Sequence, residues 1–170
     1  MTTLALDPTA LAALTAWATG QFAGPFRPTT SVVAPARPVE VTVEVTVNDL
    51  VYEARATYER VSARAAYQLV LFRRAVLVDI RPEAQRRAEG EVHEAWGPVV
   101  VERNVLEWRL DPRSSARLPW VGEDMRVLVL CQEGYASSLA TASLVRLGVR
   151  ATDVVGGLRA WREAGLPLAP

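Results

Sequence analysis

The sequence contains a single thiol, Cys131, and its position favours nucleophilic chemistry. The preceding residues, 126–130, form a short apolar run that is typical of a strand buried on both faces. A helix is expected to begin at Ser137, so Cys131 lies on a short loop between a buried strand and a helix N-terminus. Such a loop directs backbone N–H groups inward, where they can hold a thiolate or a charged derivative of it. Gly134 allows the loop to curl tightly. A lone cysteine is also commonly a small buried hydrophobic residue, so position alone leaves both interpretations open.

The composition excludes several other kinds of chemistry. One cysteine cannot form an intramolecular disulfide, and one histidine cannot build a His-rich metal site, so we expect no metal site. All 19 basic residues are arginine, which excludes Schiff-base chemistry through lysine and a P-loop lysine.

The charge and hydropathy patterns also limit the partners. The 19 basic residues balance 19 acidic ones, so the whole chain offers no electrostatic case for binding nucleic acid or an anionic membrane. No apolar run approaches the ~20 residues that are needed to span a bilayer. A lone thiol without an export signal predicts a cytoplasmic protein.

From about residue 60 the pattern alternates between strand-like and helix-like segments. Ser62 is expected to cap a helix that continues to Phe72. The expected strands cover residues 75–80, 99–101, 126–130 and 152–155, and the later helices cover residues 82–88, 104–110, 137–147 and 157–164. This alternation predicts an α/β fold, in which an open parallel sheet is flanked by helices on both faces.

Residues 1–58 show a different pattern and predict an N-terminal extension. A short helix is expected from Asp7 to Gly20, followed by a proline-rich linker over residues 24–38. Residues 39–58 then alternate apolar and polar side chains around a turn signal at Asn48-Asp49, which predicts a β-hairpin with one apolar face. This face must be buried, either on the core of the same chain or on a second copy, which would make the protein a homodimer.

The stretch from about residue 60 to 170 resembles the rhodanese, or sulfurtransferase, domain. Residues 78–81, Val-Asp-Ile-Arg, are similar to a motif that follows the second strand of that family, and residues 103–107 are similar to its segment after the third strand. Residues 156–167, Gly-Gly-Leu-Arg-Ala-Trp-Arg-Glu-Ala-Gly-Leu-Pro, resemble its terminal signature, and residues 131–136 occupy the place of its active-site loop. The resemblance divides the chain into the extension, 1–58, and a rhodanese-like domain, 59–170.

The resemblance implies a sulfurtransferase that works through a Cys131 persulfide without a cofactor. The thiolate would take a sulfur atom from a small-molecule donor, such as thiosulfate, mercaptopyruvate or a low-molecular-weight persulfide, and pass it to a thiol or to cyanide. Asp79 and Arg81 are expected to support the strand end beside the loop. The loop residues expected to cradle the persulfide are Gln132, Glu133, Gly134, Tyr135, Ala136 and Ser137.

The sequence departs from the family at the loop. Some members carry cationic side chains there, whereas this chain has Gln132, Glu133 and Ala136, so thiosulfate is expected to be a poor donor. Arg86, Arg87 and Arg103 are the candidates for cations at the rim. His93 lies off the position of the family's histidine, and we interpret it as a loop or surface residue.

The loop and its flanking segments bear on two alternatives to sulfur transfer. Phosphatases that share this fold require an arginine six positions after the cysteine, and residue 137 is serine, so the bidentate phosphate clamp is lost. A catalytically weak or inactive rhodanese-like binding module remains open, because the loop is acidic and the segment from Gly90 to Ala95 is altered.

Overall fold

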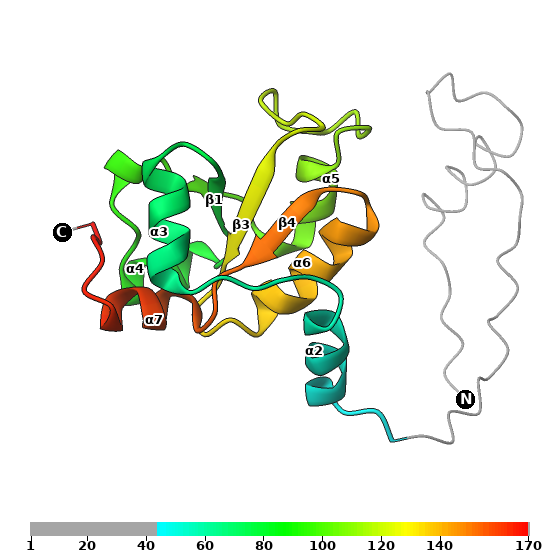
Figure 1. Ribbon diagram of the computed structural model, residues 1–170, viewed down its shortest axis with the longest axis horizontal. Helices are drawn as coiled ribbons and strands as arrows, with labels where there is room; N and C mark the ends of the chain where they lie inside the picture. The colour runs from blue at the N-terminus through cyan, green and yellow to red at the C-terminus, as the bar shows by residue number, and fades with distance from the viewer. Residues whose placement is uncertain (1–43, 170) are drawn as a thin grey trace, which may run out of the picture. The chain divides into compact units, whose positions relative to one another are not determined.

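A computed structural model describes residues 44–169, and its centre is a four-stranded parallel sheet (Figure 1). The strands lie in the order β2-β1-β3-β4. The two longest pairings join β1 to β3 and β3 to β4. Their bounds are β1 Val76–Asp79, β2 Val99–Val100, β3 Arg126–Leu130 and β4 Arg150–Asp153. The α/β fold with a parallel sheet is therefore confirmed.

Helices cover both faces of the sheet (Figure 1). Helices α3 (Ala63–Leu71) and α7 (Gly157–Glu163) pack together on one face. Helices α5 (Leu106–Leu110) and α6 (Ala136–Arg146) pack together on the other. The connections add α4 (Glu83–Glu89) and two short 3-10 helices, η1 (Glu94–Trp96) and η2 (Arg103–Val105). Ser62 caps α3 as predicted, since its hydroxyl accepts a hydrogen bond from Ala65 N at 3.3 Å.

The central position of strand β3 explains why the four residues that follow Arg126 are apolar. Val127 and Val129 pack into the core under α5 and α6, whereas Leu128 and Leu130 pack into the core under α3 and α7. All four side chains are fully buried, because successive side chains of a strand point to opposite faces and both faces are covered here. The sheet thus provides a rigid base for the loop that follows Leu130.

The predicted β-hairpin is wrong, because residues Val47–Arg55 form a helix, α2. Thr46 and Asp49 form a reciprocal capping box: the Thr46 hydroxyl accepts from Asp49 N at 3.3 Å, and the Asp49 carboxylate accepts from Thr46 N at 2.8 Å. The residues that suggested a turn are therefore the first turn of a helix. Val51 and Ala54, three positions apart, are buried on one face, and α2 packs against α6.

Part of the apolar face assigned to the hairpin is exposed. Val45, Val47 and Tyr52 are 54%, 64% and 79% exposed. Residues 39–43, the predicted helix at 7–20 and the proline-rich linker lie outside the described residues, and the division of the chain at residue 58 stays a prediction. No helix within residues 44–169 combines the length and the apolar character that crossing a bilayer requires.

Candidate active site at the carboxyl end of β3

Cys131 lies directly after β3, at the base of a loop that ends where α6 begins. Its sulfur atom accepts hydrogen bonds from Gly134 N at 3.2 Å and Ser137 N at 3.3 Å. The thiol in turn donates to the Ser137 hydroxyl at 3.2 Å, and the whole residue is 6% exposed. Gly134 has φ +80°, a conformation that favours glycine and that turns its N–H toward the sulfur. The arrangement offers two backbone dipoles to a negative charge on the sulfur.

A buried carboxylate, that of Asp153, binds two serine side chains where the loop meets α6. It lies at the end of β4 and is fully buried. It accepts hydrogen bonds from the hydroxyls of Ser137 at 3.3 Å and Ser138 at 3.1 Å. A chain of hydrogen bonds therefore runs from the Cys131 thiol through Ser137 to Asp153.

Asp153 is itself held by two residues that precede α3. Arg60 forms two hydrogen bonds to the carboxylate, at 2.7 and 2.8 Å, and Tyr58 donates a third at 3.2 Å. Burial, followed by the negative charge of Asp153, raises the pKa of Tyr58 to about 12. The hydrogen bond to Asp153 is the main reason that the pKa of Arg60 is raised above its usual value.

Arg55, at the end of α2, holds the loop from the same side. Its guanidinium donates to Gly134 O at 2.9 Å and to the Ser138 hydroxyl at 3.0 Å. It also lies 5.3 Å from the centroid of the Tyr135 ring, within the range of a cation–π contact. Sequence reasoning missed Arg55, Tyr58, Arg60 and Asp153, because these residues are distant from Cys131 in the sequence and nothing in their spacing shows that they meet at the loop.

Asp79 and Arg81 lie on the other side of Cys131, at the end of β1. Arg81 is 1% exposed and donates to both carboxylate oxygens of Asp79, at distances from 2.7 to 3.1 Å. The same guanidinium donates to Gly90 O at 2.9 Å and to the Gln132 side-chain oxygen at 3.3 Å. The structure thus places this pair where it fixes the side chain next to the cysteine.

The first turn of helix α7 binds the backbone of the loop. Leu158 N donates to Cys131 O at 2.9 Å, and Arg159 N donates to Gln132 O at 3.0 Å. At Gly157 a Cβ atom would lie 2.3 Å from Cys131 O, and the backbone has φ +59°. Only glycine fits this position, which gives a physical reason for the second glycine of the terminal signature.

A pocket of about 400 Å³ opens over the thiol. Its lining residues are Gln85, Glu89, Cys131, Gln132, Glu133, Tyr135 and Ala136. Two carboxylates and no arginine contribute to this lining. Each carboxylate lies near a guanidinium group: Arg159 Nη1 is 2.6 Å from Glu133 Oε1, and Arg81 Nη1 is 3.7 Å from Glu89 Oε2.

The three arginines expected at the rim do not line this pocket. Each forms an ion pair instead: Arg86 with Glu91, Arg87 with Glu83, and Arg103 with Glu107. His93 also lies outside the pocket lining, and its Nδ1 accepts a hydrogen bond from Ala95 N at 3.1 Å at the start of η1. Within residues 44–169, no group of three His, Cys, Asp or Glu side chains is arranged to hold a metal ion.

Comparison with known proteins finds solved structures with a similar fold. No protein-family model and no curated protein matches the sequence. Among solved structures, a Rhodopseudomonas palustris protein of unknown function, described as a possible tyrosine phosphatase, is 27% identical, with a TM-score of 0.67 over 77% of this chain and 99% of that one.

Two sulfurtransferases also match. The homodimeric polysulfide-sulfur transferase of Wolinella succinogenes is 24% identical, with a TM-score of 0.55 over 70% of this chain and 83% of that one. A thiosulfate sulfurtransferase from Pseudomonas aeruginosa is 22% identical, with a TM-score of 0.55 over 72% of this chain and 22% of that one. The chain therefore has a rhodanese-like fold.

Proposed function

We propose that the protein is a sulfurtransferase in which Cys131 carries the transferred sulfur as a persulfide. With thiosulfate or a persulfide, the thiolate attacks the outer sulfur, the donor's sulfur–sulfur bond breaks, and the remainder of the donor leaves with the electron pair. With mercaptopyruvate, the carbon–sulfur bond breaks instead and the enolate of pyruvate leaves. A thiolate or cyanide then attacks the outer sulfur of the persulfide and releases the Cys131 thiolate. Neither step consumes an oxidant or a reductant beyond the donor and the acceptor.

The observation that carries this proposal is the pair of hydrogen bonds that Gly134 N and Ser137 N donate to the sulfur atom. A negative charge at this point is stabilised by fixed backbone dipoles, which need no reorganisation during the reaction. The pocket above the thiol leaves room for a second sulfur atom and a small donor.

The charges at the mouth bear on the choice of donor. Glu89 and Glu133 line the pocket, and the Arg159 guanidinium is already engaged by Glu133. A dianion such as thiosulfate is therefore at a disadvantage compared with a neutral or less charged donor. We propose a low-molecular-weight persulfide as the donor and a thiol as the acceptor.

Phosphate-ester hydrolysis is disfavoured by the same loop. A phosphate clamp needs a guanidinium at position 137, and Ser137 is instead buried and bonded to Asp153. A non-catalytic binding module is the second candidate, and the acidic lining of the pocket favours it.

The test is an intact-mass measurement after incubation with thiosulfate, mercaptopyruvate or cysteine persulfide. Because the chain has one cysteine, a gain of one sulfur atom that a thiol or cyanide reverses reports the Cys131 persulfide alone. Cys131→Ser should gain no sulfur and should keep the wild-type circular dichroism spectrum, whereas Ser143→Ala, on the same helix as Ser137, should load normally. A wild-type protein that stays unmodified with every donor would leave the binding module as the function.

A further inference from the structure

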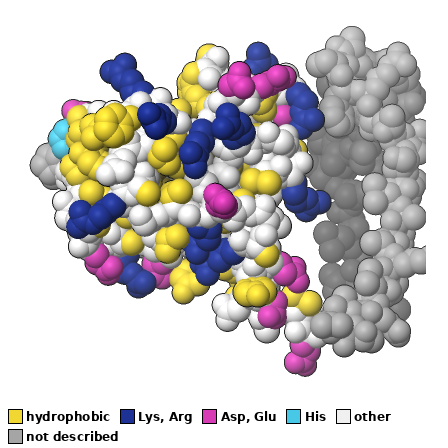
Figure 2. Space-filling model, in the orientation of Figure 1, with side chains coloured by type: hydrophobic (Ala, Val, Ile, Leu, Met, Phe, Trp, Pro, Cys, Tyr) yellow, Lys and Arg dark blue, Asp and Glu magenta, His cyan; other side chains and the backbone are white. Residues whose placement is uncertain are grey.

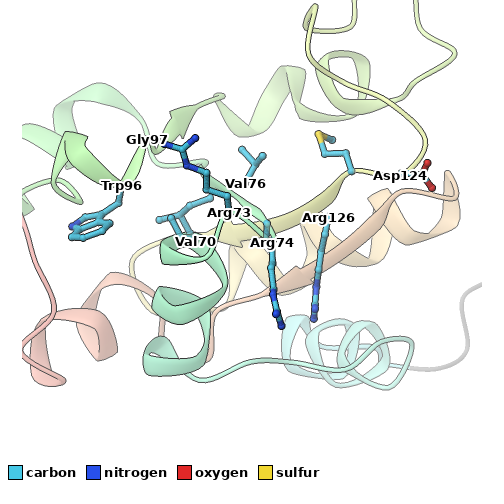
Figure 3. Close-up of a pocket in the computed structure, with 11 residues that line it drawn as sticks. Val70, Arg73, Arg74, Val76, Trp96, Gly97, Asp124 and Arg126 are labelled. Atoms are coloured by element: carbon cyan, nitrogen blue, oxygen red, sulfur yellow. The ribbon is translucent and has the colours of Figure 1, made fainter.

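A second pocket lies at the opposite end of the sheet, where β1 and β3 begin (Figure 3). Its volume is about 350 Å³, within the range of small-molecule sites. Because β3 carries Arg126 at its start and Leu130 at its end, the Cα atoms that mark the two ends lie about 13 Å apart. The residues that line the pocket are Val70, Arg73, Arg74, Ala75, Val76, Leu77, Trp96, Gly97, Asp124, Met125 and Arg126.

The charges of this pocket are strongly unbalanced. Arg73, Arg74 and Arg126 line it together with one carboxylate, that of Asp124. In Figure 3 the side chains of Arg74 and Arg126 extend in the same direction, whereas that of Arg73 extends the opposite way. Arg150 adds a further positive charge, because it is the partner of Arg126 in the neighbouring strand β4. Figure 2 shows basic side chains gathered over the face that carries α3, β3 and β4.

The arginines of this pocket form no ion pair with any residue that the structure describes. Near the Cys131 loop, Arg60 and Arg81 bind buried carboxylates, and Arg86 and Arg159 bind glutamates. Across residues 44–169, by contrast, no ion pair involves the side chains of Arg73, Arg74 or Arg126. Guanidinium groups gathered without counter-charges repel one another, and an anion bound between them relieves the repulsion.

The backbone conformation of Arg73 also supports a binding role for this residue. Residue 73 follows the end of α3 in the left-handed conformation, with φ +53°, and Arg74 N donates to Leu69 O at 2.8 Å to close the helix. Glycine is the residue that fits such a position without strain, yet an arginine occupies it. A cation near a helix C-terminus is favoured by the helix dipole, but this accounts only for Arg73 and Arg74, since Arg126 begins a strand.

We propose that this pocket binds a small organic anion that joins a phosphate group to an apolar or aromatic part. Guanidinium groups match the geometry of phosphate oxygens, and the charge of the pocket favours a dianion over a single carboxylate. Val70, Val76 and Trp96 supply an apolar surface beside the arginines. The balanced charge of the chain and the small volume favour such a molecule over an extended polyanion. The site is independent of sulfur transfer at Cys131.

Isothermal titration calorimetry of the full-length protein with naphthyl phosphate tests this proposal. Naphthyl phosphate should bind more tightly than inorganic phosphate and more tightly than naphthol, and added salt should weaken the binding. Arg126→Gln should raise the Kd by about fivefold, whereas Asp124→Asn should lower it. Arg64→Gln is the matched control, because Arg64 lies on α3 but about 13 Å from Arg73 along the helix and outside the pocket lining.

Arg73→Gly separates binding from structure. It should weaken naphthyl phosphate binding and at the same time raise the Tm, because it removes a guanidinium and relieves a strained backbone position. Unchanged affinity in Arg73→Gly together with unchanged affinity in Arg126→Gln would overturn the proposal, as would an equal loss of affinity in Arg64→Gln. Absence of binding by the wild-type protein would also overturn it.

Discussion

Arg60 and Asp153 form a bidentate ion pair, in which Nε lies 2.7 Å from Oδ1 and Nη2 lies 2.8 Å from Oδ2. The carboxylate is fully buried and also accepts a hydrogen bond from the Ser137 hydroxyl. That hydroxyl in turn accepts a hydrogen bond from the Cys131 thiol. The pair thus links the segment before α3 to the reactive sulfur. A residue that lies just after the predicted extension takes part in shaping the candidate active site.

Asp153→Asn should lower the free energy of unfolding by about 3 kcal/mol, because it leaves the mostly buried Arg60 guanidinium without a counter-charge. Urea denaturation measures the change. Asp111→Asn is the control, since it breaks an ion pair with Arg113, whose side chain is 71% exposed, and should cost much less. Equal losses in the two variants would show that the Arg60–Asp153 pair contributes no more than a surface pair.

Tyr58 should make the protein less stable at alkaline pH. Its pKa is raised to about 12 in the folded protein, mainly by burial, from about 10 in an unfolded chain. The folded state therefore holds the phenol proton more tightly. The resulting stability is complete below about pH 10 and is lost as the pH rises toward about 12.

Tyr58→Phe should accordingly show a shallower fall of the urea midpoint between about pH 9 and about pH 11 than the wild-type protein shows. Tyr52→Phe alters a tyrosine of α2 that is 79% exposed, and it should keep the wild-type fall. Parallel curves for wild type and Tyr58→Phe would mean that Tyr58 does not carry the pH dependence.

Glu133→Gln should increase kcat/KM for thiosulfate by about two- to fivefold at low salt, because it removes a carboxylate from the pocket mouth and releases Arg159. The gain should shrink as ionic strength increases. Arg159→Gln should have the opposite effect, and Glu123→Gln, outside the pocket lining, should have none. A gain that does not depend on salt would contradict an electrostatic cause.

Removing residues 1–58 should lower the Tm by roughly 5–10 °C relative to a chain that begins at residue 44. The shorter chain loses Arg55 and Tyr58, which donate to Gly134 O, Ser138 O and Asp153, whereas the longer one keeps these hydrogen bonds. Thermal unfolding followed by circular dichroism measures the difference. The same Tm for both chains would show that α2 is dispensable for stability.

The sheet and its helices were predictable because their signals are local. The apolar run before Cys131 and the capping residue Ser62 each determine an element within a few positions, and the structure has both elements where the sequence places them. The prediction at residues 47–55 was wrong because the same apolar residues fit both a strand-like alternation and a helical spacing. The capping box of Thr46 and Asp49 stabilises the helix. The partners of the loop could not be predicted, because Arg55 and Gly134 meet only through the packing of α2 on α6.

The close fit of Gly157 against Cys131 O also makes the loop depend on the last helix of the chain. The carbonyl groups of Cys131 and Gln132 accept hydrogen bonds from the N–H groups of Leu158 and Arg159. A side chain at position 157 would separate α7 from the loop and leave these two carbonyl groups without their donors. The surroundings of the cysteine are therefore set in part by a glycine that contributes no side chain to them.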